Sequence, residues 1–382
     1  MIFLTFTHFF TYIYVWWCNM KNICVIFGGK SVENEVSVIT AKQVIQNFDY
    51  SKYKLYPVYI DKQGKFWTGN NFDDVKIFNN FNTKKHKSIT FQGGSGGFFI
   101  KRKFVKIDCA VVCCHGTGGE DGSLQGLLNM AEIPYTSCGV EASAICMNKI
   151  TMKKMFEYLS LPVTKYITLN KEQYKNLTVN DVKLDYPLFV KPANLGSSVG
   201  INKCNNFNQV KQALEIAFHF DNKVIIEQGV QNLIEYNCSA MNINGKVVAS
   251  QIEQPHAWSE FLNFDDKYIK KGKKFAKKVK KVNIGKRLEQ KIKQMTVFTY
   301  EQLNMKGVVR TDYLYDKTNK KLYINEVNTI PGSLAYYLWK SHNLSFKDII
   351  DNLITQALQD CENNKQISTS YKSSIFDKYL KE

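Results

Sequence analysis

The chain has 382 residues, 44% of them hydrophobic and 13% aromatic, which gives it the composition of a soluble globular protein and the length of two or three domains. Its ten cysteines contain no CxxC pair, which argues against a zinc site or a disulfide framework and favours a cytoplasmic location. The formal charge of +17 favours an anionic partner, because lysine and arginine attract phosphates whatever molecule carries them.

Residues 1–19 are apolar and aromatic, but they are not a good targeting segment. They have no lysine or arginine at the start and no small-residue cleavage site, so they do not resemble a signal peptide. They are also short for a membrane span. Met20 then opens a natural domain start. We expect residues 1–19 to be a non-native or disordered extension that arises from start-codon choice, with a membrane anchor as the alternative.

The first predicted strand, Ile23–Phe27, ends at two glycines and passes into a helical pattern. This arrangement presents backbone N–H groups to an anion. It is not a P-loop, because that motif requires glycine where Cys24 stands. The acids Glu33 and Glu35 favour a ligand with a cationic group, such as an amine. Helix capping is the alternative for both, and it is the preferred interpretation for Glu35.

A second strand is predicted at Lys54–Ile60, followed by a hairpin-like interval and a flexible glycine turn at residues 93–97. The apolar run Asp108–Cys114 predicts a buried strand in which one of the adjacent cysteines, Cys113 or Cys114, belongs to the core. His115 follows in a glycine-rich loop. Ligands of open α/β sheets collect beyond the carboxyl ends of strands, so His115 is a candidate site residue, with a structural histidine as the alternative.

A helix is predicted over Ala144–Leu159, and it carries Lys149 near its start. The next strand, Tyr186–Lys191, ends in a lysine and is followed by a glycine- and serine-rich loop. Lysine at the end of a buried strand, beside loop N–H groups and hydroxyls, suits a phosphate clamp. An ordinary surface turn is the alternative. Two further strands are predicted, at residues 223–227 and 236–242.

Two extended runs, Val308–Tyr315 and Leu322–Asn328, predict a hairpin. Alternation along a strand places Arg310 and Asp312 on one face of the first, and Glu326 and Asn328 on one face of the second. If the faces coincide, two carboxylates and an amide form a hard-oxygen site that suits Mg²⁺. The alternative is a solvated hairpin with ordinary surface charges.

The densest basic cluster, Lys270–Lys281, permits a nucleic-acid patch, but no base-stacking aromatic motif surrounds it. A solvated loop is therefore the preferred interpretation. The polar residues from about Asn363 onward are expected to form a loosely held tail.

Six segments in this order, GGKSVENEVS, HGTGGEDG, VKPANLGSSVG, DDKYI, VVRTDY and INEVNTIPGS, resemble the D-alanine–D-alanine ligase family of ATP-grasp enzymes. The resemblance implies a three-domain ATP-grasp fold of α/β and α+β class with an N-terminal Rossmann-like domain. The implied segments are an N-terminal α/β substrate domain at 20–139, a small ATP-grasp subdomain at 140–229, a C-terminal catalytic domain at 230–362 and a polar tail at 363–382.

The resemblance also implies a reaction. ATP is a co-substrate, and two D-alanines are joined through an acylphosphate for peptidoglycan precursor synthesis. The implied metal ligands are Asp312, Glu326 and Asn328, which hold two Mg²⁺ ions, with Mn²⁺ as a substitute. The residues implied to bind ATP are Lys149, Lys191, Glu227, Val230, Glu235 and Lys267.

The implied catalytic residues are Glu33, Ser197, Tyr268, Arg310 and Gly332. Glu33 and His115 would contact the first D-alanine, and Arg310 with the Gly332 N–H would form the oxyanion hole. The sequence after Gly332 departs from the family pattern, so Ser333 or Tyr337 would contact the second substrate.

D-Alanine is the expected acceptor, and a D-alanine–D-lactate or D-alanine–D-serine ligase is the alternative. A non-catalytic nucleotide- or nucleic-acid-binding protein is the alternative from another class. The resemblance implies a homodimer, and neither a nucleic acid nor a membrane is expected as a partner.

Overall fold

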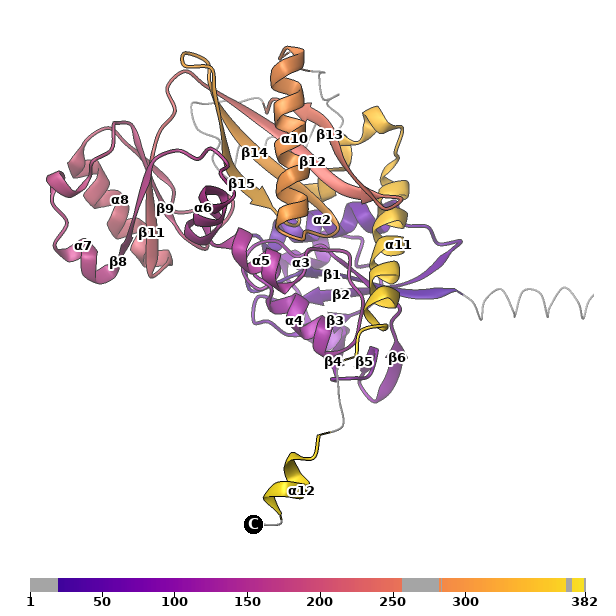
Figure 1. Cartoon of the computed structure of the whole chain (residues 1–382). Coiled ribbons are helices and arrows are strands. Elements are labelled where there is room, and N and C mark those ends of the chain that lie inside the picture. Colours follow the sequence, from indigo (N-terminus) through magenta and orange to yellow (C-terminus); the bar gives the residue numbers. More distant parts are fainter. Residues whose placement is uncertain (1–19, 256–281, 283, 369–372, 381–382) are drawn as a thin grey trace, which may run out of the picture.

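The computed structural model describes residues 20–255, 282, 284–368 and 373–380, which fold into three sheets with helices around them (Figure 1). Three sequence predictions lie outside these residues: the extension at 1–19, the site residues Lys267 and Tyr268, and the basic cluster Lys270–Lys281. Within the described part of the chain, no helix has the length and apolar character needed to cross a membrane.

The first sheet has seven strands in the order β6-β5-β4-β3-β2-β1-β7. β1 pairs in parallel with β2 and β7, and the other neighbours are antiparallel. The strands are β1 (Lys21–Gly28), β2 (Tyr53–Ile60), β3 (Phe66–Thr68), β4 (Lys87–Phe91), β5 (Gly97–Ile100), β6 (Lys103–Lys106) and β7 (Cys109–Val112). The helical segments are α2 (Asn34–Gln46), α3 (Lys76–Asn79), η1 (Thr83–Lys85) and α4 (Ser123–Met130).

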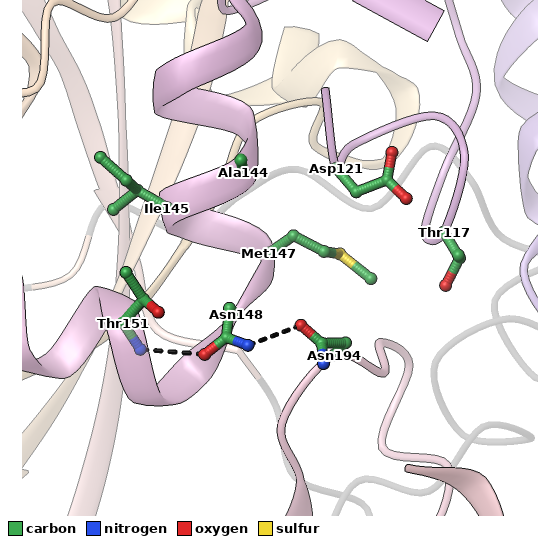
Figure 2. Close-up of a pocket in the computed structure, with 8 residues that line it drawn as sticks. All are labelled: Thr117, Asp121, Ala144, Ile145, Met147, Asn148, Thr151 and Asn194. Atoms are coloured by element: carbon green, nitrogen blue, oxygen red, sulfur yellow. Dashed lines mark hydrogen bonds between the residues drawn. The ribbon is translucent and has the colours of Figure 1, made fainter. Parts of the chain in front are cut away.

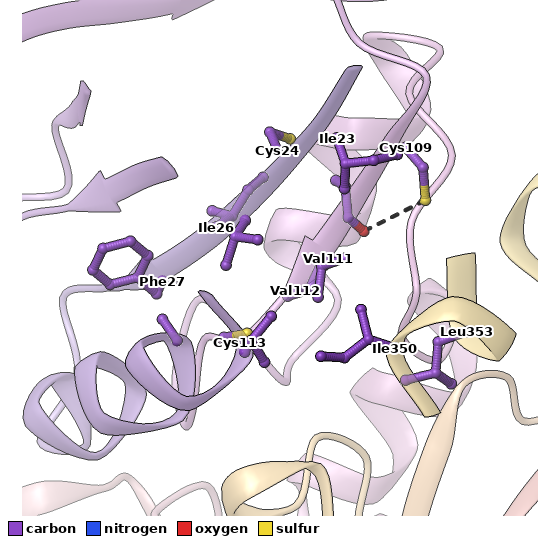
Figure 3. Packing of buried hydrophobic residues seen from close by; sticks show 14 of the residues in the cluster. Ile23, Cys24, Ile26, Phe27, Cys109, Val111, Val112, Cys113, Ile350 and Leu353 are labelled. Carbon is purple, nitrogen blue, oxygen red and sulfur yellow. Dashed lines mark hydrogen bonds between the residues drawn. The ribbon is translucent and has the colours of Figure 1, made fainter. Parts of the chain in front are cut away.

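The core of this sheet lies around β1 and β7 and also includes the C-terminal helix α11 (Phe346–Asn364). Figure 3 shows Ile350 and Leu353 of α11 beside Val111 and Val112 of β7. Strands covered on both faces read as continuous apolar runs, which is why the sequence predicts them well. Both Cys113 and Cys114 are buried, although only one was expected to be. The predicted domain boundaries stay predictions.

The second sheet is antiparallel, with four strands in the order β10-β9-β11-β8. Its strands are β8 (Tyr166–Asn170), β9 (Leu188–Pro192), β10 (Asn202–Cys204) and β11 (Lys223–Gln228). Its helical segments are α7 (Lys171–Lys175), η2 (Val179–Asp181) and α8 (Phe207–Phe220). In Figure 1 these elements form a lobe of their own beside the rest of the molecule. The apolar side of α8 packs into the core of this sheet through Val210, Leu214 and Ala217.

The third sheet is also antiparallel, in the order β13-β12-β14-β15. Its strands are β12 (Leu233–Ile243), β13 (Lys246–Glu253), β14 (Val308–Asp316) and β15 (Lys321–Asn328). The other segments here are α10 (Lys286–Gln302), η4 (Gly332–Leu338) and η5 (Lys340–His342), whereas α12 (Ile375–Tyr379) lies away from this sheet near the C-terminus (Figure 1). β14 and β15 are the predicted hairpin, and their bounds agree with the sequence prediction to within one residue.

The prediction of one helix over Ala144–Leu159 was wrong, because the chain forms two helices there. These are α5 (Val140–Met147) and α6 (Lys149–Tyr158), separated at Asn148. Asn148 has extended backbone angles, and its side chain accepts hydrogen bonds from the N–H groups of Ile150 and Thr151. Asparagine is a strong N-cap residue, so it starts a new helix and makes Lys149 the first residue of α6.

Candidate active site

The two strands of the hairpin pair in a register that brings the predicted metal ligands together. Arg310 lies opposite Asn328, and Asp312 lies opposite Glu326. Directly opposed residues of antiparallel strands point to the same face, so all four side chains lie on one face of the third sheet. The structure therefore satisfies the condition on which the sequence prediction of a hard-oxygen site depended.

Asp312 is surrounded by hydrogen-bond donors. Arg310 donates to it through Nε at 2.7 Å and through Nη2 at 2.8 Å. Asn328 donates through Nδ2 to Oδ2 at 3.1 Å. The amide of Asn237, turned so that its nitrogen faces the carboxylate, donates to Oδ1 at 3.1 Å. Burial alone would lower the pKa of Arg310, but the charge of Asp312 raises it well above its usual value, so the guanidinium stays charged.

The donor set of the hairpin fits a divalent cation. Asp312 and Glu326 supply carboxylate oxygens and Asn328 supplies an amide oxygen, which are ligands that Mg²⁺ prefers. Glu326 also attracts the lysines Lys149 and Lys191, so it lies on the side of the site that faces them. In the described residues no cluster of three or more His, Cys, Asp or Glu side chains could hold a metal ion. A metal on the hairpin therefore depends on Asn328 as well as on the two carboxylates.

A second group of charges lies where α6 meets β9 and β11. Lys149 is buried and donates through Nζ to the backbone carbonyl of Leu195 in the loop after β9. Lys191, in β9, donates through Nζ to Glu227 Oε2 at 2.8 Å. Burial lowers the pKa of Lys149. It would also lower that of Lys191, but the charge of Glu227 outweighs it and raises the pKa.

Lys153 was not among the predicted site residues, yet it belongs to this group. Its Nζ lies 3.5 Å from Glu227 Oε1 and donates to Thr164 Oγ1 at 3.2 Å. It follows Lys149 by four residues on α6, so the two side chains lie on the same side of the helix. That spacing, a second lysine one turn after a candidate lysine, is the sequence signal that would have identified it.

Two other predicted nucleotide contacts, Val230 and Glu235, follow β11 in the chain. Val230 is half-buried in the connection between β11 and β12. Glu235 lies in β12 opposite Leu314 of β14, and its charge attracts Lys191. Of the predicted nucleotide residues, Lys149, Lys191, Glu227 and Glu235 are close enough for their charges to affect one another, and their role at a nucleotide stays a prediction.

Glu33 stands at the N-cap position of α2, but its side chain makes no capping hydrogen bond. Instead, Ser197 donates through Oγ to Glu33 Oε1, which joins α2 to the loop after β9. Glu33 is 7% exposed, whereas Glu35 is exposed in the first turn of α2, 3.4 Å from Lys62 Nζ. Glu33 is therefore linked to the loop after β9, whereas Glu35 lies at the exposed start of α2, and the roles predicted for both stay predictions.

His115 lies at the carboxyl end of β7 and links that strand to α2 and to the loop after β15. Its Nε2 is 2.8 Å from Thr40 Oγ1, which also accepts a hydrogen bond from the Ser333 N–H at 3.2 Å. The ring also hydrogen-bonds the backbone of Ile330. Burial, together with the charge of Arg310, lowers the pKa of His115 to about 4, so the imidazole is neutral at pH 7.

Glu120 is a further residue that the sequence analysis did not place in the site. It accepts hydrogen bonds from the N–H groups of Gly116 at 2.8 Å and Ile330 at 3.0 Å. It thereby holds the glycine-rich loop after β7 against the loop after β15. Burial, together with the charge of Glu33, raises the pKa of Glu120 to about 8.

We expect the variant His115→Gln to lose less stability in acid than the wild type. The folded pKa of about 4 lies below the ordinary value of 6.5, so the unfolded chain binds the proton first as the pH falls. The neutral histidine contributes to the free energy of unfolding above pH 6.5, and this contribution is lost as the pH falls toward 4. Urea titrations at pH 7.5 and pH 5 should show that the wild type loses about 2 kcal/mol more than the variant between the two.

The control for this titration is His219→Gln, because His219 is exposed on α8. It should behave like the wild type at both pH values. Equal losses of stability in the wild type and in His115→Gln would contradict the assignment of a buried neutral imidazole.

The segment η4 after β15 places the last predicted residues. Ser333, Leu334 and Ala335 have φ values of 55°, 49° and 48°, a left-handed conformation that costs non-glycine residues energy. The turn brings Tyr337 against Arg310, to which its hydroxyl is hydrogen-bonded. Gly332 begins the segment, and no atom lies within 4 Å of the place where its side chain would start. The Gly332 backbone therefore borders open space near the Arg310 end of the hairpin.

The structure has a cavity of about 550 Å³ between three segments (Figure 2). It lies between the loop after β7, the junction of α5 with α6 and the loop after β9. Asn148 donates through Nδ2 to Asn194 Oδ1 at 2.7 Å, and Figure 2 shows this pair bridging the helix junction and the loop. The residues that line the cavity are Thr117, Asp121, Ala144, Ile145, Met147, Asn148, Thr151 and Asn194. None of them is a predicted site residue.

Comparisons with known proteins agree over nearly the whole chain. The family models described as D-ala D-ala ligase N-terminus and C-terminus match residues 22–138 and 155–355. A D-alanine–D-alanine ligase of Thermosipho africanus is 39% identical and covers 94% of this chain and 99% of the relative. A D-alanine–D-alanine ligase of Staphylococcus epidermidis is 33% identical and covers 91% of this chain and 97% of the relative.

Solved structures show the same likeness. The D-alanine-D-alanine ligase from Coxiella burnetii has a TM-score of 0.77 at 25% identity, with 91% of this chain and 97% of that one covered. The VanG D-Ala:D-Ser ligase from Enterococcus faecalis has a TM-score of 0.76 at 28% identity, with 88% and 99% covered. These neighbours have the ATP-grasp fold, which confirms the predicted fold class.

Proposed function

This chain belongs to the D-alanine–D-alanine ligase family, and from that premise we propose which of its residues carry each part of the reaction. The enzyme is an ATP-dependent, ADP-forming ligase that joins two D-alanines for cell-wall synthesis. The observation that carries the residue assignments is the shared face of the hairpin, where Arg310, Asp312, Glu326 and Asn328 lie together.

Glu33 is assigned to the ammonium group of the first D-alanine. Glu33 is buried beside Gly116 and Gly196 and accepts a hydrogen bond from Ser197, and a carboxylate in such a place suits a cationic substrate group. The neutral His115 lies one residue before Gly116, whose backbone adjoins Glu33, so it borders the same substrate. An uncharged imidazole there adds no positive charge that would compete with the substrate ammonium for Glu33.

The charged residues where α6 meets β9 and β11 are assigned to the nucleotide. Lys149 and Lys191 lie at the start of α6 and in β9, where their ammonium groups can neutralise phosphate charge. Glu227 is assigned to the amino group of adenine, Val230 to a backbone contact with the ring, and Glu235 to the ribose hydroxyls. Lys267 keeps its predicted role at the phosphates and lies outside the described residues.

Asp312, Glu326 and Asn328 are assigned as ligands of two divalent cations, Mg²⁺ with Mn²⁺ as a substitute. When bound, such cations neutralise the charge that would otherwise keep the carboxylate of D-alanine from the γ-phosphate of ATP. Arg310 makes two hydrogen bonds to Asp312 that fix the orientation of its guanidinium, which supports its assignment to the oxyanion hole. Its partner in the proposed oxyanion hole is the N–H of Gly332.

The second half of the reaction needs a group that positions the incoming amine. Ser197, already bound to Glu33, is assigned to this role together with Tyr268, which lies outside the described residues. Ser333 and Tyr337 are assigned to the carboxylate of the second D-alanine. Tyr337 supports this assignment because its hydroxyl lies at Arg310, where the two substrates must meet.

The test is D-alanine-dependent release of phosphate from ATP by the purified full chain. Release should require ATP, D-alanine and a divalent cation, and chelation with EDTA should stop it. Folded protein that releases no phosphate with D-alanine would overturn the proposed site. Competition of D-alanine against D-lactate and D-serine at pH 7 then tests the acceptor, and preferential formation of D-alanyl-D-lactate or D-alanyl-D-serine would contradict the choice of D-alanine.

We expect Gly196→Ala to weaken binding of the first D-alanine. A methyl group at Gly196 would overlap Glu33 Oε2, so the carboxylate must move away from its present position. Misplacing a substrate contact by about 1 Å can cost on the order of a hundredfold, so the KM for D-alanine should rise by about tenfold or more.

The matched control is Gly126→Ala, because no atom lies within 4 Å of the added methyl group in α4. Alanine also favours a helix interior over glycine, so this variant should keep the wild-type KM and gain slight stability. A Gly196→Ala enzyme with unchanged kinetics for D-alanine would remove Glu33 from the first substrate site.

The oligomeric state, the location and the domains of the enzyme are proposed from its family. A homodimer and a cytoplasmic location are typical of the family, and size-exclusion chromatography with light scattering would test the first. The segments at 20–139, 140–229 and 230–362 are proposed as its domains, and limited proteolysis should cut near residues 139 and 229 if they are correct.

A further inference from the structure

Lys153 is a fully buried lysine to which the proposed reaction gives no task. It is 1% exposed, and its ammonium group contacts three neighbours. Nζ lies 3.5 Å from Glu227 Oε1, donates to Thr164 Oγ1 at 3.2 Å and lies 5.8 Å from the ring centre of Tyr166. Burying a lysine is costly unless its charge is paired, so the pair with Glu227 is the interaction that makes its burial tolerable.

Glu227 thus has a lysine on each carboxylate oxygen, and the two lysines differ in access. Lys191 binds Oε2 at 2.8 Å with 13% of its side chain exposed, whereas Lys153 faces Oε1 with 1% exposed. Of the two lysines, Lys191 is the more open to a nucleotide in the proposed site. Burial alone would raise the pKa of Glu227, but the two lysines lower it to about 2, so the group is a carboxylate at pH 7.

The proposed function gives Lys191 a second partner, the phosphates of ATP. When the ammonium group of Lys191 turns toward phosphate oxygens, it loses part of its contact with Glu227. Lys153 lies behind the carboxylate, where no phosphate can displace it. It is therefore the cation that stays on Glu227 when the nucleotide is bound.

We propose that Lys153 is a positioning residue for recognition of the base: it holds Glu227 in the orientation in which the carboxylate accepts a hydrogen bond from the amino group of adenine. This inference rests on the proposed assignment of Glu227 to adenine. Lys153 touches neither the nucleotide nor the reacting atoms, so it acts only through Glu227. If Lys153 has this role, the enzyme should prefer nucleotides whose purine carries a 6-amino group.

The test measures equilibrium binding of two nucleotides by calorimetry, ATP and purine riboside 5′-triphosphate, which lacks only the 6-amino group. The wild type should prefer ATP by about tenfold or more, the value of a hydrogen bond to a charged group. Lys153→Met should weaken ATP binding by about tenfold and leave binding of the analogue nearly unchanged, so that the preference disappears.

Two further variants keep this test decisive. Lys154→Met removes the adjacent lysine, which is exposed on α6, and should keep the full preference for ATP. Lys153→Arg keeps a cation behind Glu227 and should retain part of the preference. If Lys153→Met loses its cooperative unfolding transition, Lys153→Gln, which keeps a donor for Thr164, replaces it in the comparison.

The proposal is overturned if folded Lys153→Met keeps the preference for ATP, or if it weakens both nucleotides equally, as a purely structural role would. A wild type without any preference overturns both the adenine assignment and this inference. The ligase assignment is tested separately, because D-alanine-dependent phosphate release by the wild type does not depend on the choice between the two bases.

Discussion

Replacing Glu326 with glutamine should reduce D-alanine-dependent phosphate release by about a thousandfold, because it removes one of two anionic ligands proposed for the divalent cations. The amide has the shape of the carboxylate, so the fold should survive. Glu326 lies directly opposite Asp312 and attracts both Lys149 and Lys191, so its charge stands between the hairpin and the nucleotide lysines. The loss should appear in kcat at saturating ATP.

The matched control is Glu301→Gln. Glu301 is exposed on α10, so this substitution makes the same chemical change away from the site. Its activity should equal that of the wild type. A titration with Mg²⁺ tells whether a defect comes from a lost metal ligand. Only the loss of a ligand shifts the Mg²⁺ concentration that gives half-maximal activity. Full activity in Glu326→Gln would remove Glu326 from the metal site.

Arg310→Lys is expected to reduce kcat by about a hundredfold to a thousandfold, although the charge is kept. The arginine fork binds Asp312 through Nε and Nη2 and also contacts Tyr337. A lysine ammonium cannot hold Asp312 in this two-point geometry and still face the developing oxyanion. The KM for ATP should change little, since Arg310 is assigned to the acyl transfer and not to the nucleotide.

Arg287→Lys supplies the control, because Arg287 is exposed near the start of α10. Steady-state kinetics with D-alanine and ATP varied separately distinguish the outcomes. A defect that lies only in the KM for ATP would place Arg310 at the nucleotide, and wild-type kinetics would remove it from the site altogether.

The fold class and most strands could be predicted because their residues follow local rules. β1 and β7 are continuous apolar runs, as strands covered on both faces must be. Asn148 shows where such rules were read incompletely, since an asparagine before a helical pattern is a start signal. The apolar periodicity on both sides of it suggested one helix, and the cap that separates α5 from α6 was missed.

Alternation along β14 and β15 determined, from the sequence by itself, that Arg310 shares a face with Asp312 and Glu326 with Asn328. Whether the two faces coincide depends on the register, and a shift by one residue would have sent one pair to the opposite side. Only the paired strands decide this, because register is a property of two segments together. The structure sets Asp312 opposite Glu326, which makes a site from two separate pairs.

The remaining site contacts were decided by the tertiary structure alone. Ser197 and Glu33 are 164 residues apart, and Lys153 meets Glu227 only because α6 packs against β11. Motifs determine which residue types can do the chemistry, since a carboxylate or a lysine has the same properties wherever it stands. Periodicity and spacing say nothing about contacts across such separations. Those depend on how the sheets and helices pack, because burial beside a partner sets the charge, orientation and role of each group.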